Sequence, residues 1–425
     1  MSKRRIRQME NMICAVMMGA LLCGCSTEKT DYSASDTPVT VYLTEGSSFV
    51  DIIDSYNQQV SEDGRKIEYT LFPAEDSENM YQKMTNELLA GEGPDLFYFD
   101  SSNPVNLDRL SSQEAFLSIE DIKVPSMISD SAQRGIFPIS YQIPLLFTTD
   151  KACEKYNIDI EKEILTEEDL DILAGNDVAV LSDPYAVFDV MYESYVDREK
   201  EESMFGEAKF RDILERAAMW KTAGNGSDGV YYGVSMEELR EISRGSLLFS
   251  MTSTFTSPIN IVTLYNLVHT QFGEELVLFG IGESENDLKA YACEMVAVNV
   301  NSDNQEGAVD FVKYLLSSEV QSCTEEGFRK LSGIPVLDAA RADEIEMMTT
   351  VPYKENYTDI ETGISETLRE KYTGLLEQAE TVVIRDNLYK YSIFDPLMDS
   401  YKKGGISLDT LIEELDKKTE LYLKE

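Results

Sequence analysis

The sequence predicts an α/β protein built on mostly parallel sheets flanked by helices. Short apolar runs at residues 39–43, 67–72 and 96–99 have the length and composition of strands, and segments of helical periodicity separate them. The last of these runs is continuously apolar, which is typical of a strand covered on both faces. This βαβαβ alternation gives a mostly parallel sheet with helices packed on it.

The helix and strand that end at residue 99 show this organisation most clearly. Tyr81, Met84 and Leu88 form one apolar stripe of a helix, and Gly91 stands where a left-handed C-cap is favoured. A Gly-Pro-Asp turn then leads into the buried strand, and a polar loop follows it. Because ligands of open α/β sheets bind at the carboxyl ends of strands, this loop is a candidate ligand contact.

The N-terminus predicts a lipoprotein. Four basic residues precede an apolar run at residues 12–22, which is too short for an ordinary membrane span, so residues 1–24 are interpreted as a signal peptide. Leu-Cys-Gly-Cys at residues 22–25 resembles a bacterial lipobox, which implies a lipid on Cys25 and a location at the extracytoplasmic face of the bacterial cell membrane. A plain secretory signal is the alternative. Residues 25–38 are polar and aperiodic, which predicts a flexible tether.

Composition excludes one class of partner. The net charge of −41 repels nucleic acids and other anionic polymers. Beyond the lipobox the chain has Cys153, Cys293 and Cys323. An odd number without CxxC spacing does not indicate a disulfide framework. The fold should therefore depend on a hydrophobic core, which the 43% apolar composition can supply.

The rest of the chain continues the alternation. Residues 49–56 form an amphipathic helix, and the apolar run at 135–147 contains two prolines, which suits an extended crossing between two parts of the fold. Helices dominate residues 166–222, where Trp220 is expected to pack in the core or at the surface rather than against a ligand. A further strand is expected at 293–299, and the chain ends in an amphipathic helix.

The sequence shows no catalytic signature, and we predict neither an enzyme nor a cofactor. His269 is the only histidine, and its apolar neighbours favour a partly buried structural role over that of a base. HExxH, GxSxG and GxxxxGK patterns and Cys/His metal clusters are all absent from the sequence. A glycosidase needs two positioned carboxylates, and the many acidic residues do not single out a pair.

One spacing is similar to a calcium-binding loop. Asn299, Asn301, Asp303 and Asp310 match four positions of such a loop, but Asn304 replaces the required glycine and no bidentate glutamate closes it. A cap on the following helix explains these residues better, so no metal is predicted.

Three sequence motifs, taken in their order along the chain, indicate a resemblance to one protein family. The lipobox, the segment ELLAGEGPD at residues 87–95, and the helix at 306–316 followed by Gln321 and Gly-Ile-Pro-Val at 333–336 resemble family 1 extracellular solute-binding proteins, the maltose-binding-protein-like receptors of ABC importers. The resemblance implies two lobes, each a mostly parallel sheet flanked by helices, with a ligand cleft between them. It also implies a monomer that delivers its solute to transporter permease subunits.

The same resemblance assigns the lobes and the ligand-binding residues. The N-terminal lobe would comprise residues 39–140 plus 282–316, and the C-terminal lobe 141–279 plus 317–425. The candidate contacts are Thr44, Glu45, Phe99, Asp100, Ser101, Asn103, Tyr141, Gln142, Asp183, Tyr185, Phe255 and Tyr391. Structural alternatives exist: Phe99 as a core residue, Asp100 and Ser101 as turn caps, Tyr185 as a packing residue, and Glu45 as a solvated acid.

Sugars need aromatic platforms beside carboxylates and amides, so a neutral sugar or oligosaccharide fits this set best. The set contains many acids and neither arginine nor lysine, which disfavours phosphate and carboxylate ligands. A polyamine or another cationic solute is one alternative, because carboxylates bind ammonium groups strongly. A surface carbohydrate-active enzyme or a sensor module is another.

Overall fold

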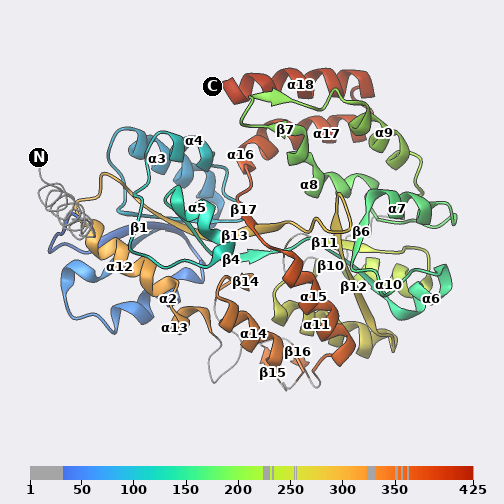
Figure 1. The fold of residues 1–425 in the computed structure, drawn as a ribbon, viewed down its shortest axis with the longest axis horizontal. Helices are drawn as coiled ribbons and strands as arrows, with labels where there is room; N and C mark the ends of the chain where they lie inside the picture. The colour runs from blue at the N-terminus through green and yellow to red at the C-terminus, as the bar shows by residue number, and fades with distance from the viewer. Residues whose placement is uncertain are drawn as a thin grey trace, which may run out of the picture. The chain divides into compact units, whose positions relative to one another are not determined.

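The computed structural model describes residues 32–223, 230–231, 234–252, 254, 256–322, 331–349, 353–355, 358–360 and 363–424. The predicted signal peptide, Cys25, Phe255 and Cys323 lie outside these residues. Residues from Ala34 onward form one compact unit containing two separate sheets (Figure 1). Part of the predicted tether belongs to this unit, since the carbonyl oxygen of Thr37 accepts a hydrogen bond from Asn304 (2.7 Å).

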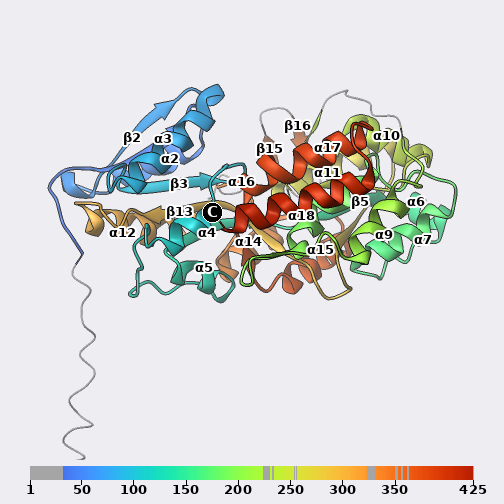
Figure 2. The ribbon, with the colours of Figure 1, turned by 90° about the horizontal axis from the view of Figure 1, so that it is seen from above.

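The first sheet has the strand order β14-β4-β13-β3-β1-β2, with β17 beside β13. Strand β1 pairs in parallel with both β2 and β3, which confirms the predicted βαβαβ start. Strand β13 is antiparallel to β3 and β4, and Figure 2 shows β3 and β13 running side by side. The strands are β1 (Val39–Thr44), β2 (Ile67–Phe72), β3 (Leu96–Asp100), β4 (Ile136–Gln142), β13 (Ala290–Val298), β14 (Ile334–Pro335) and β17 (Val382–Val383).

Both faces of the first sheet are covered, as the continuous apolar run of β3 predicted. On one face Tyr98 stacks on Phe49 of α2, with ring centroids 4.3 Å apart. On the other face Phe97 and Phe99 pack edge-on against Phe116, at 5.9 and 6.3 Å. Successive side chains of a strand point to opposite faces, so β3 contributes aromatic rings to both layers.

The second sheet has the order β11-β5-β12-β6. Strands β6 and β12 are parallel, whereas β5 pairs antiparallel with β11 and β12, so both sheets are mixed. Its strands are β5 (Leu145–Thr149), β6 (Ile164–Thr166), β11 (Ser250–Thr252) and β12 (Leu276–Gly282). Three two-stranded ribbons complete the β structure of the described residues: β7 (Val196–Asp197) with β8 (Glu202–Ser203), β9 (Val230–Tyr231) with β10 (Val234–Ser235), and β15 (Tyr353–Glu355) with β16 (Thr358–Ile360).

Two chain crossings join the sheets. Strand β4 of the first sheet continues through Ile143 and Pro144 into β5 of the second, and β12 of the second leads into β13 of the first. The first crossing is the proline-containing extended run. Thr256 Oγ1 accepts a hydrogen bond from Ile143 N (3.1 Å), which fixes that connection. Strands β14 and β17, from the last part of the chain, also join the first sheet. The exact residues at which the lobes divide stay a prediction.

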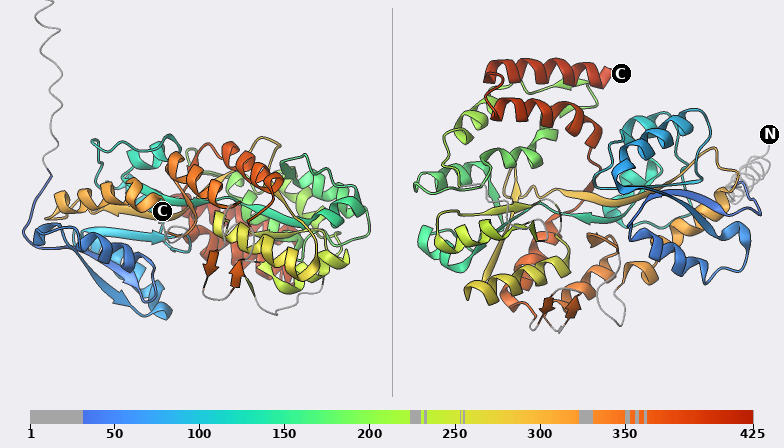
Figure 3. Two further views of the ribbon diagram at one scale, coloured as in Figure 1. Left: turned by 90° about the horizontal axis from the view of Figure 1, so that it is seen from below. Right: turned by 180° about the vertical axis from the view of Figure 1, so that it is seen from behind.

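Helices surround the sheets, and a large apolar cluster beside the second sheet contains Trp220, which is 7% exposed. Of the two structural placements expected for Trp220, core or surface, the structure shows the core. Helices α17 and α18 pack against each other (Figure 3). The helices are α2 (Phe49–Asn57), α3 (Ser77–Leu89), α4 (Leu107–Ser112), α5 (Ser129–Gln133), α6 (Asp150–Tyr156), α7 (Glu167–Ala174), α8 (Phe188–Met191), α9 (Ala208–Ala217), α10 (Met236–Arg244), α11 (Pro258–Phe272), α12 (Gln305–Leu315), α13 (Ser318–Gln321), α14 (Asp338–Met347), α15 (Glu366–Gln378), α16 (Asn387–Tyr389), α17 (Asp395–Lys402) and α18 (Leu408–Lys424).

None of the helices in the described part of the chain combines the length and apolarity that a bilayer crossing needs. Cys153 and Cys293 are both buried, Cys153 on α6 and Cys293 on β13.

Candidate functional site

A cavity of about 620 Å³ lies where the two sheets approach each other. One side is formed by the carboxyl ends of β1, β3 and β4 and by the start of the antiparallel β13. The opposite side is formed by the segment between β11 and α11 and by the first turn of α11. The volume falls within the range of about 300–1,000 Å³ that is common for small-molecule sites. The cavity therefore has the position and size expected of a ligand cleft.

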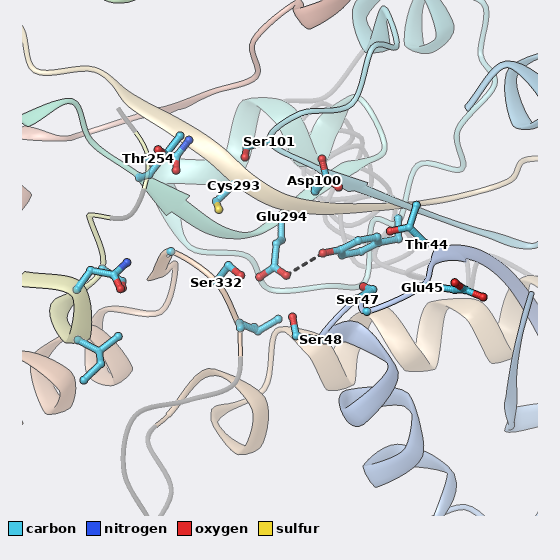
Figure 4. A pocket seen from close by; sticks show the side chains of 18 residues that line it. Thr44, Glu45, Ser47, Ser48, Asp100, Ser101, Thr254, Cys293, Glu294 and Ser332 are labelled. Carbon is cyan, nitrogen blue, oxygen red and sulfur yellow. Dashed lines mark hydrogen bonds between the residues drawn. The ribbon is translucent and has the colours of Figure 1, made fainter. Parts of the chain in front are cut away.

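The loop after β1 contributes the hydroxyl groups of Thr44, Ser47 and Ser48 (Figure 4). A tight turn places them there, because Ser47 N donates to the carbonyl oxygen of Thr44 (3.2 Å) and Gly46 has a φ of 83°. Glycine adopts this left-handed conformation without steric cost. Glu45 lies in the same turn and is exposed.

Glu294 on β13 is a cavity residue that the sequence analysis did not select. It is 2% exposed, and its carboxylate accepts hydrogen bonds from Tyr98 Oη (2.8 Å) and Ser140 Oγ (3.2 Å). Burial raises the pKa of Tyr98 well above its usual value, which keeps its hydroxyl a donor. Figure 4 shows the Glu294 carboxylate facing the cavity interior, near Ser332. The sequence signal that could have identified Glu294 is an acidic residue inside an otherwise apolar strand.

The second-sheet side presents the start of a long helix. Pro258 occupies the first turn of α11, and Ser257, Ile259 and Asn260 line the cavity. The first turn of a helix leaves backbone N–H groups without intrahelical acceptors and carries a partial positive charge. This side therefore favours ligand oxygen atoms that accept hydrogen bonds. Glu294 across the cavity favours ligand groups that donate them.

A smaller cavity of about 150 Å³ adjoins the first, and we call it the side cavity. Ser101, Gln142 and Thr254 line both cavities, so the two share a wall. The rest of its lining is Asp189, Ala292, Met295, Arg385, Asn387, Lys390 and Tyr391. The last four of these residues lie near a π-helical turn, η6 (Lys390–Phe394), between α16 and α17. Turns of this kind often occur at functional sites.

Half of the predicted contacts line these cavities. Thr44, Glu45, Asp100, Ser101 and Gln142 line the main cavity, and Tyr391, which is 45% exposed, lines the side cavity. Asp100 also holds the turn after β3, since its carboxylate accepts hydrogen bonds from Ser102 N (2.8 Å) and Ser102 Oγ (2.6 Å).

Three predicted contacts are buried in the first sheet and line neither cavity. Phe99 is completely buried among aromatic rings on the face opposite Tyr98. Asn103 is 1% exposed, and its amide nitrogen donates to the carbonyl oxygen of Asp100 (2.7 Å). Tyr141 is also fully buried, next to Gln142 on β4. Because side chains alternate along a strand, Tyr141 and Gln142 cannot face the same side.

Two further candidates lie away from both cavities. Asp183 caps a short helical turn by accepting a hydrogen bond from Tyr185 N (2.9 Å), and it pairs with Lys402 (2.8 Å). Tyr185 packs edge-on against Tyr401, with ring centroids 5.8 Å apart. Both side chains therefore have structural contacts here, in line with the packing alternative considered for Tyr185.

His269 is exposed, whereas a partly buried position was expected. Its side chain is 51% exposed, lies 3.2 Å from Glu275 and stacks on Tyr265. It lines neither of the two cavities. His269 lies on the solvent-facing side of α11, and the apolar residues next to it in the sequence point in other directions around the helix.

The calcium-like spacing is occupied by structural contacts. The side-chain nitrogen of Asn299 donates to the carbonyl oxygens of Glu92 and Pro94, at 3.1 Å each. Asn304 caps α12 by accepting a hydrogen bond from Gly307 N (3.3 Å), so the cap lies one residue after the segment 301–303 that was expected to provide it. In the described part of the chain, no group of three or more His, Cys, Asp or Glu side chains is placed to hold a metal ion.

No protein-family model and no curated protein matches the sequence. Solved structures do share its fold. An ABC substrate-binding protein from Listeria monocytogenes in complex with cycloalternan has a TM-score of 0.58 at 11% identity, covering 92% of this chain and 100% of that one. The cyclic α-maltosyl-1,6-maltose binding protein from Arthrobacter globiformis has a TM-score of 0.57 at 14% identity, with 92% and 100% coverage. A receptor from Streptomyces glaucescens, solved with acarbose, has a TM-score of 0.54 at 13% identity, with 92% and 99% coverage.

The chain thus has the two-lobe fold of extracellular solute-binding proteins of ABC transporters, the fold that the motifs predicted. At these identities the likeness concerns the fold, and the ligand has to be argued from the cavity itself.

Proposed function

We propose that this protein is a lipid-anchored receptor that captures a sugar or oligosaccharide in the main cavity and delivers it to an ABC transporter permease. The observation that carries the proposal is the lining of that cavity. Its hydroxyl groups come from both sides, and its carboxylates are Glu45, Asp100 and Glu294. No arginine or lysine lines it among the described residues. Carboxylates and amides accept the hydroxyl donors of a sugar ring, and hydroxyl groups and helix N–H groups bind its oxygens.

The likeness to sugar-binding structures supports the same ligand class. The solved proteins named above bind, by their descriptions, cycloalternan, a cyclic maltosyl-maltose and acarbose. All three are carbohydrates. The aromatic side chains that line the cavities are Tyr98 in the main cavity and Tyr391 in the side cavity, whereas the single Trp220 belongs to the core.

Closure of the lobes would couple binding to delivery. The sheets are joined by the β4–β5 and β12–β13 crossings, and Gln142, at the end of β4, lines both cavities. Rotation about such crossings is the usual closing motion of two-lobe receptors. We assign residues 39–140 plus 282–316 to one lobe and residues 141–279 plus 317–425 to the other. Strands β14 and β17 of the second group extend the sheet of the first lobe.

A binding screen tests the function. A soluble form that begins at Ser26 is heated with neutral mono- and oligosaccharides and with polyamines such as spermidine. A ligand at a hundred times its Kd adds about 2.7 kcal/mol of stability, which is a measurable rise in melting temperature. Stabilisation by polyamines and by no saccharide would replace this proposal with the cationic-solute alternative. Chromatography of bound sugars after long incubation detects turnover, and cleaved products would identify an enzyme.

The anchor and the delivery step need separate tests. Cys25→Ser should move the protein from the membrane fraction to the medium, because the lipid is attached to this thiol. Retention of the variant on the membrane would argue against lipidation at Cys25. Loss of uptake of the identified sugar on deletion of the gene, with recovery on complementation, would support delivery, whereas unchanged uptake would contradict it.

A further inference from the structure

Arg385 in the side cavity has a buried guanidinium group with no ionic partner. It follows β17, which pairs in parallel with β13, so Arg385 lies over the ring of Tyr291, with its guanidinium carbon 3.6 Å from the ring centroid. Its Nε and Nη2 atoms are inaccessible to solvent and have no hydrogen-bond acceptor. Among the described residues, no carboxylate lies within ion-pair distance of it. Burying a cation without a counter-charge or hydrogen-bond acceptors raises the free energy of the folded state.

The neighbouring charges are already compensated. Lys390, which also lines the side cavity, pairs with Asp189 (3.0 Å) and with Asp395 (2.8 Å). Arg198 pairs with Asp386 (2.9 Å), the residue that directly follows Arg385. The chain thus places carboxylates beside these two basic groups, whereas in the described residues Arg385 contacts Tyr291 and no carboxylate lies within ion-pair distance of it.

One internal acid acts on Arg385 from farther away. Glu193 attracts the guanidinium electrostatically but forms no ion pair with it. Burial raises the pKa of the Glu193 carboxyl, which favours its neutral form, and its oxygen accepts a hydrogen bond from Tyr192 Oη (3.3 Å). Glu193 therefore acts on Arg385 from beyond ion-pair distance.

The side cavity suits a small charged group attached to a larger ligand. At about 150 Å³ this cavity is much smaller than the main cavity of about 620 Å³, so it suits one compact substituent and not a whole sugar ring. The shared wall of Ser101, Gln142 and Thr254 joins this space to the main cavity. Asn387 fixes the wall, since its side-chain nitrogen donates to the carbonyl oxygen of Ser101 (3.0 Å).

We propose that the side cavity is an anion subsite, in which Arg385 binds a carboxylate, sulfate ester or phosphate ester carried by a saccharide whose rings occupy the main cavity. The inference rests on the proposed function and specifies its ligand class: an acidic sugar instead of a neutral one. The sequence favoured a neutral sugar because no basic residue was among the predicted contacts. The fold brings Arg385 and Lys390 beside the cleft from a distant part of the chain. The guanidinium carries a permanent positive charge, which attracts such groups.

The test compares sugars that differ only at one position. Titration calorimetry measures glucose, glucuronate, glucose 6-sulfate and glucose 6-phosphate, the corresponding galactose series, and neutral and acidic di- and trisaccharides. The proteins are the wild type, Arg385→Gln, Arg385→Lys and a matched control, Arg211→Gln. Arg211 is a surface arginine on α9 that lines neither cavity, and its side chain is 38% exposed. The three acidic forms distinguish carboxylate from ester ligands.

We expect the wild type to bind an acidic sugar roughly 10- to 100-fold more tightly than its neutral partner, the effect of a hydrogen-bonded charge. Arg385→Gln should abolish this preference, Arg385→Lys should keep part of it, and Arg211→Gln should keep all of it. Added salt should lower the affinity for the acidic sugar and not that for its neutral partner.

Equal binding of neutral and acidic partners by the wild type would overturn the anion subsite and leave the sugar receptor intact. A preference that survives in Arg385→Gln would overturn it as well. If Arg385→Gln does not fold, the wild-type preference, its salt dependence and the Arg385→Lys variant decide. Failure of every saccharide, neutral or acidic, would instead reject the proposed function and this inference with it.

Discussion

Replacement of Glu294 by glutamine should separate ligand binding from stability. In the wild type Tyr98 Oη donates to one carboxylate oxygen of Glu294 (2.8 Å) and Ser140 Oγ to the other (3.2 Å). The glutamine oxygen can still accept from Tyr98, and its NH₂ group can donate to the Ser140 hydroxyl, but the charge is lost. Each bond to a charged group contributes about 1.5–3 kcal/mol and each neutral one about 0.5–1.5. The weaker hydrogen bonds lower the stability, but burying an uncharged amide costs less desolvation free energy than burying a carboxylate, which offsets this loss. We expect the unliganded stability to change by about 1 kcal/mol or less and saccharide affinity to fall roughly 10- to 100-fold.

Urea unfolding followed by circular dichroism measures the first quantity, and titration calorimetry the second. Glu294→Ala should behave differently, because it leaves two buried hydroxyl groups without an acceptor, at about 1–3 kcal/mol each. Glu274→Gln is the matched control: this glutamate is 5% exposed and accepts a hydrogen bond from Ser243 Oγ (2.9 Å), but it lines neither cavity. Wild-type affinity in Glu294→Gln, or an equal loss in Glu274→Gln, would refute the assignment of Glu294 as a ligand contact.

Three other predictions concern residues outside the cavities. Asn299→Ala should lower the free energy of unfolding by about 2–4 kcal/mol, because the carbonyl oxygens of Glu92 and Pro94 lose their donor. Added Ca²⁺ should not shift the melting temperature of the wild type, and a shift would support the calcium-loop interpretation. The fluorescence of Trp220 should be blue-shifted in the folded state and nearly insensitive to ligand, since it lies in the core; a large change on sugar binding would contradict this placement. Burial raises the pKa of the Cys153 thiol to about 12, so iodoacetamide at pH 8 should modify it far more slowly in the folded protein than in urea, as peptide mass spectrometry would measure.

Local patterns in the sequence predicted most of the fold. The strands β1, β2 and β3 and their helices follow from apolar runs and helical stripes, because each is decided by neighbouring residues. The loop after β3 was located by the same reasoning, and Asp100 and Ser101 do line the cavity. What failed was the choice between adjacent residues: Phe99 and Tyr141 point away from the site that their neighbours line. That choice depends on strand register, which is set by distant partners.

The missed residues have a different cause. Glu294 enters the site because β13 pairs with β3 and β4, and Arg385 because β17 pairs with β13. Both pairings join segments far apart in the chain, so no local pattern signals them. A charged residue in an apolar strand could have marked Glu294. For Arg385, only the arrangement in space reveals that its charge is left without a partner.

The position of β13 in the first sheet has a consequence for folding order. The strand lies between β3 and β4, although the whole second sheet is encoded between β4 and β13. As synthesis proceeds from the N-terminus, β3 and β4 are therefore complete long before the strand that pairs with both. Until then each presents an unpaired, largely apolar edge, and such edges invite aggregation. A fragment that ends before Ala290 should accumulate as aggregate, and the first lobe can only become a stable body after most of the second has emerged.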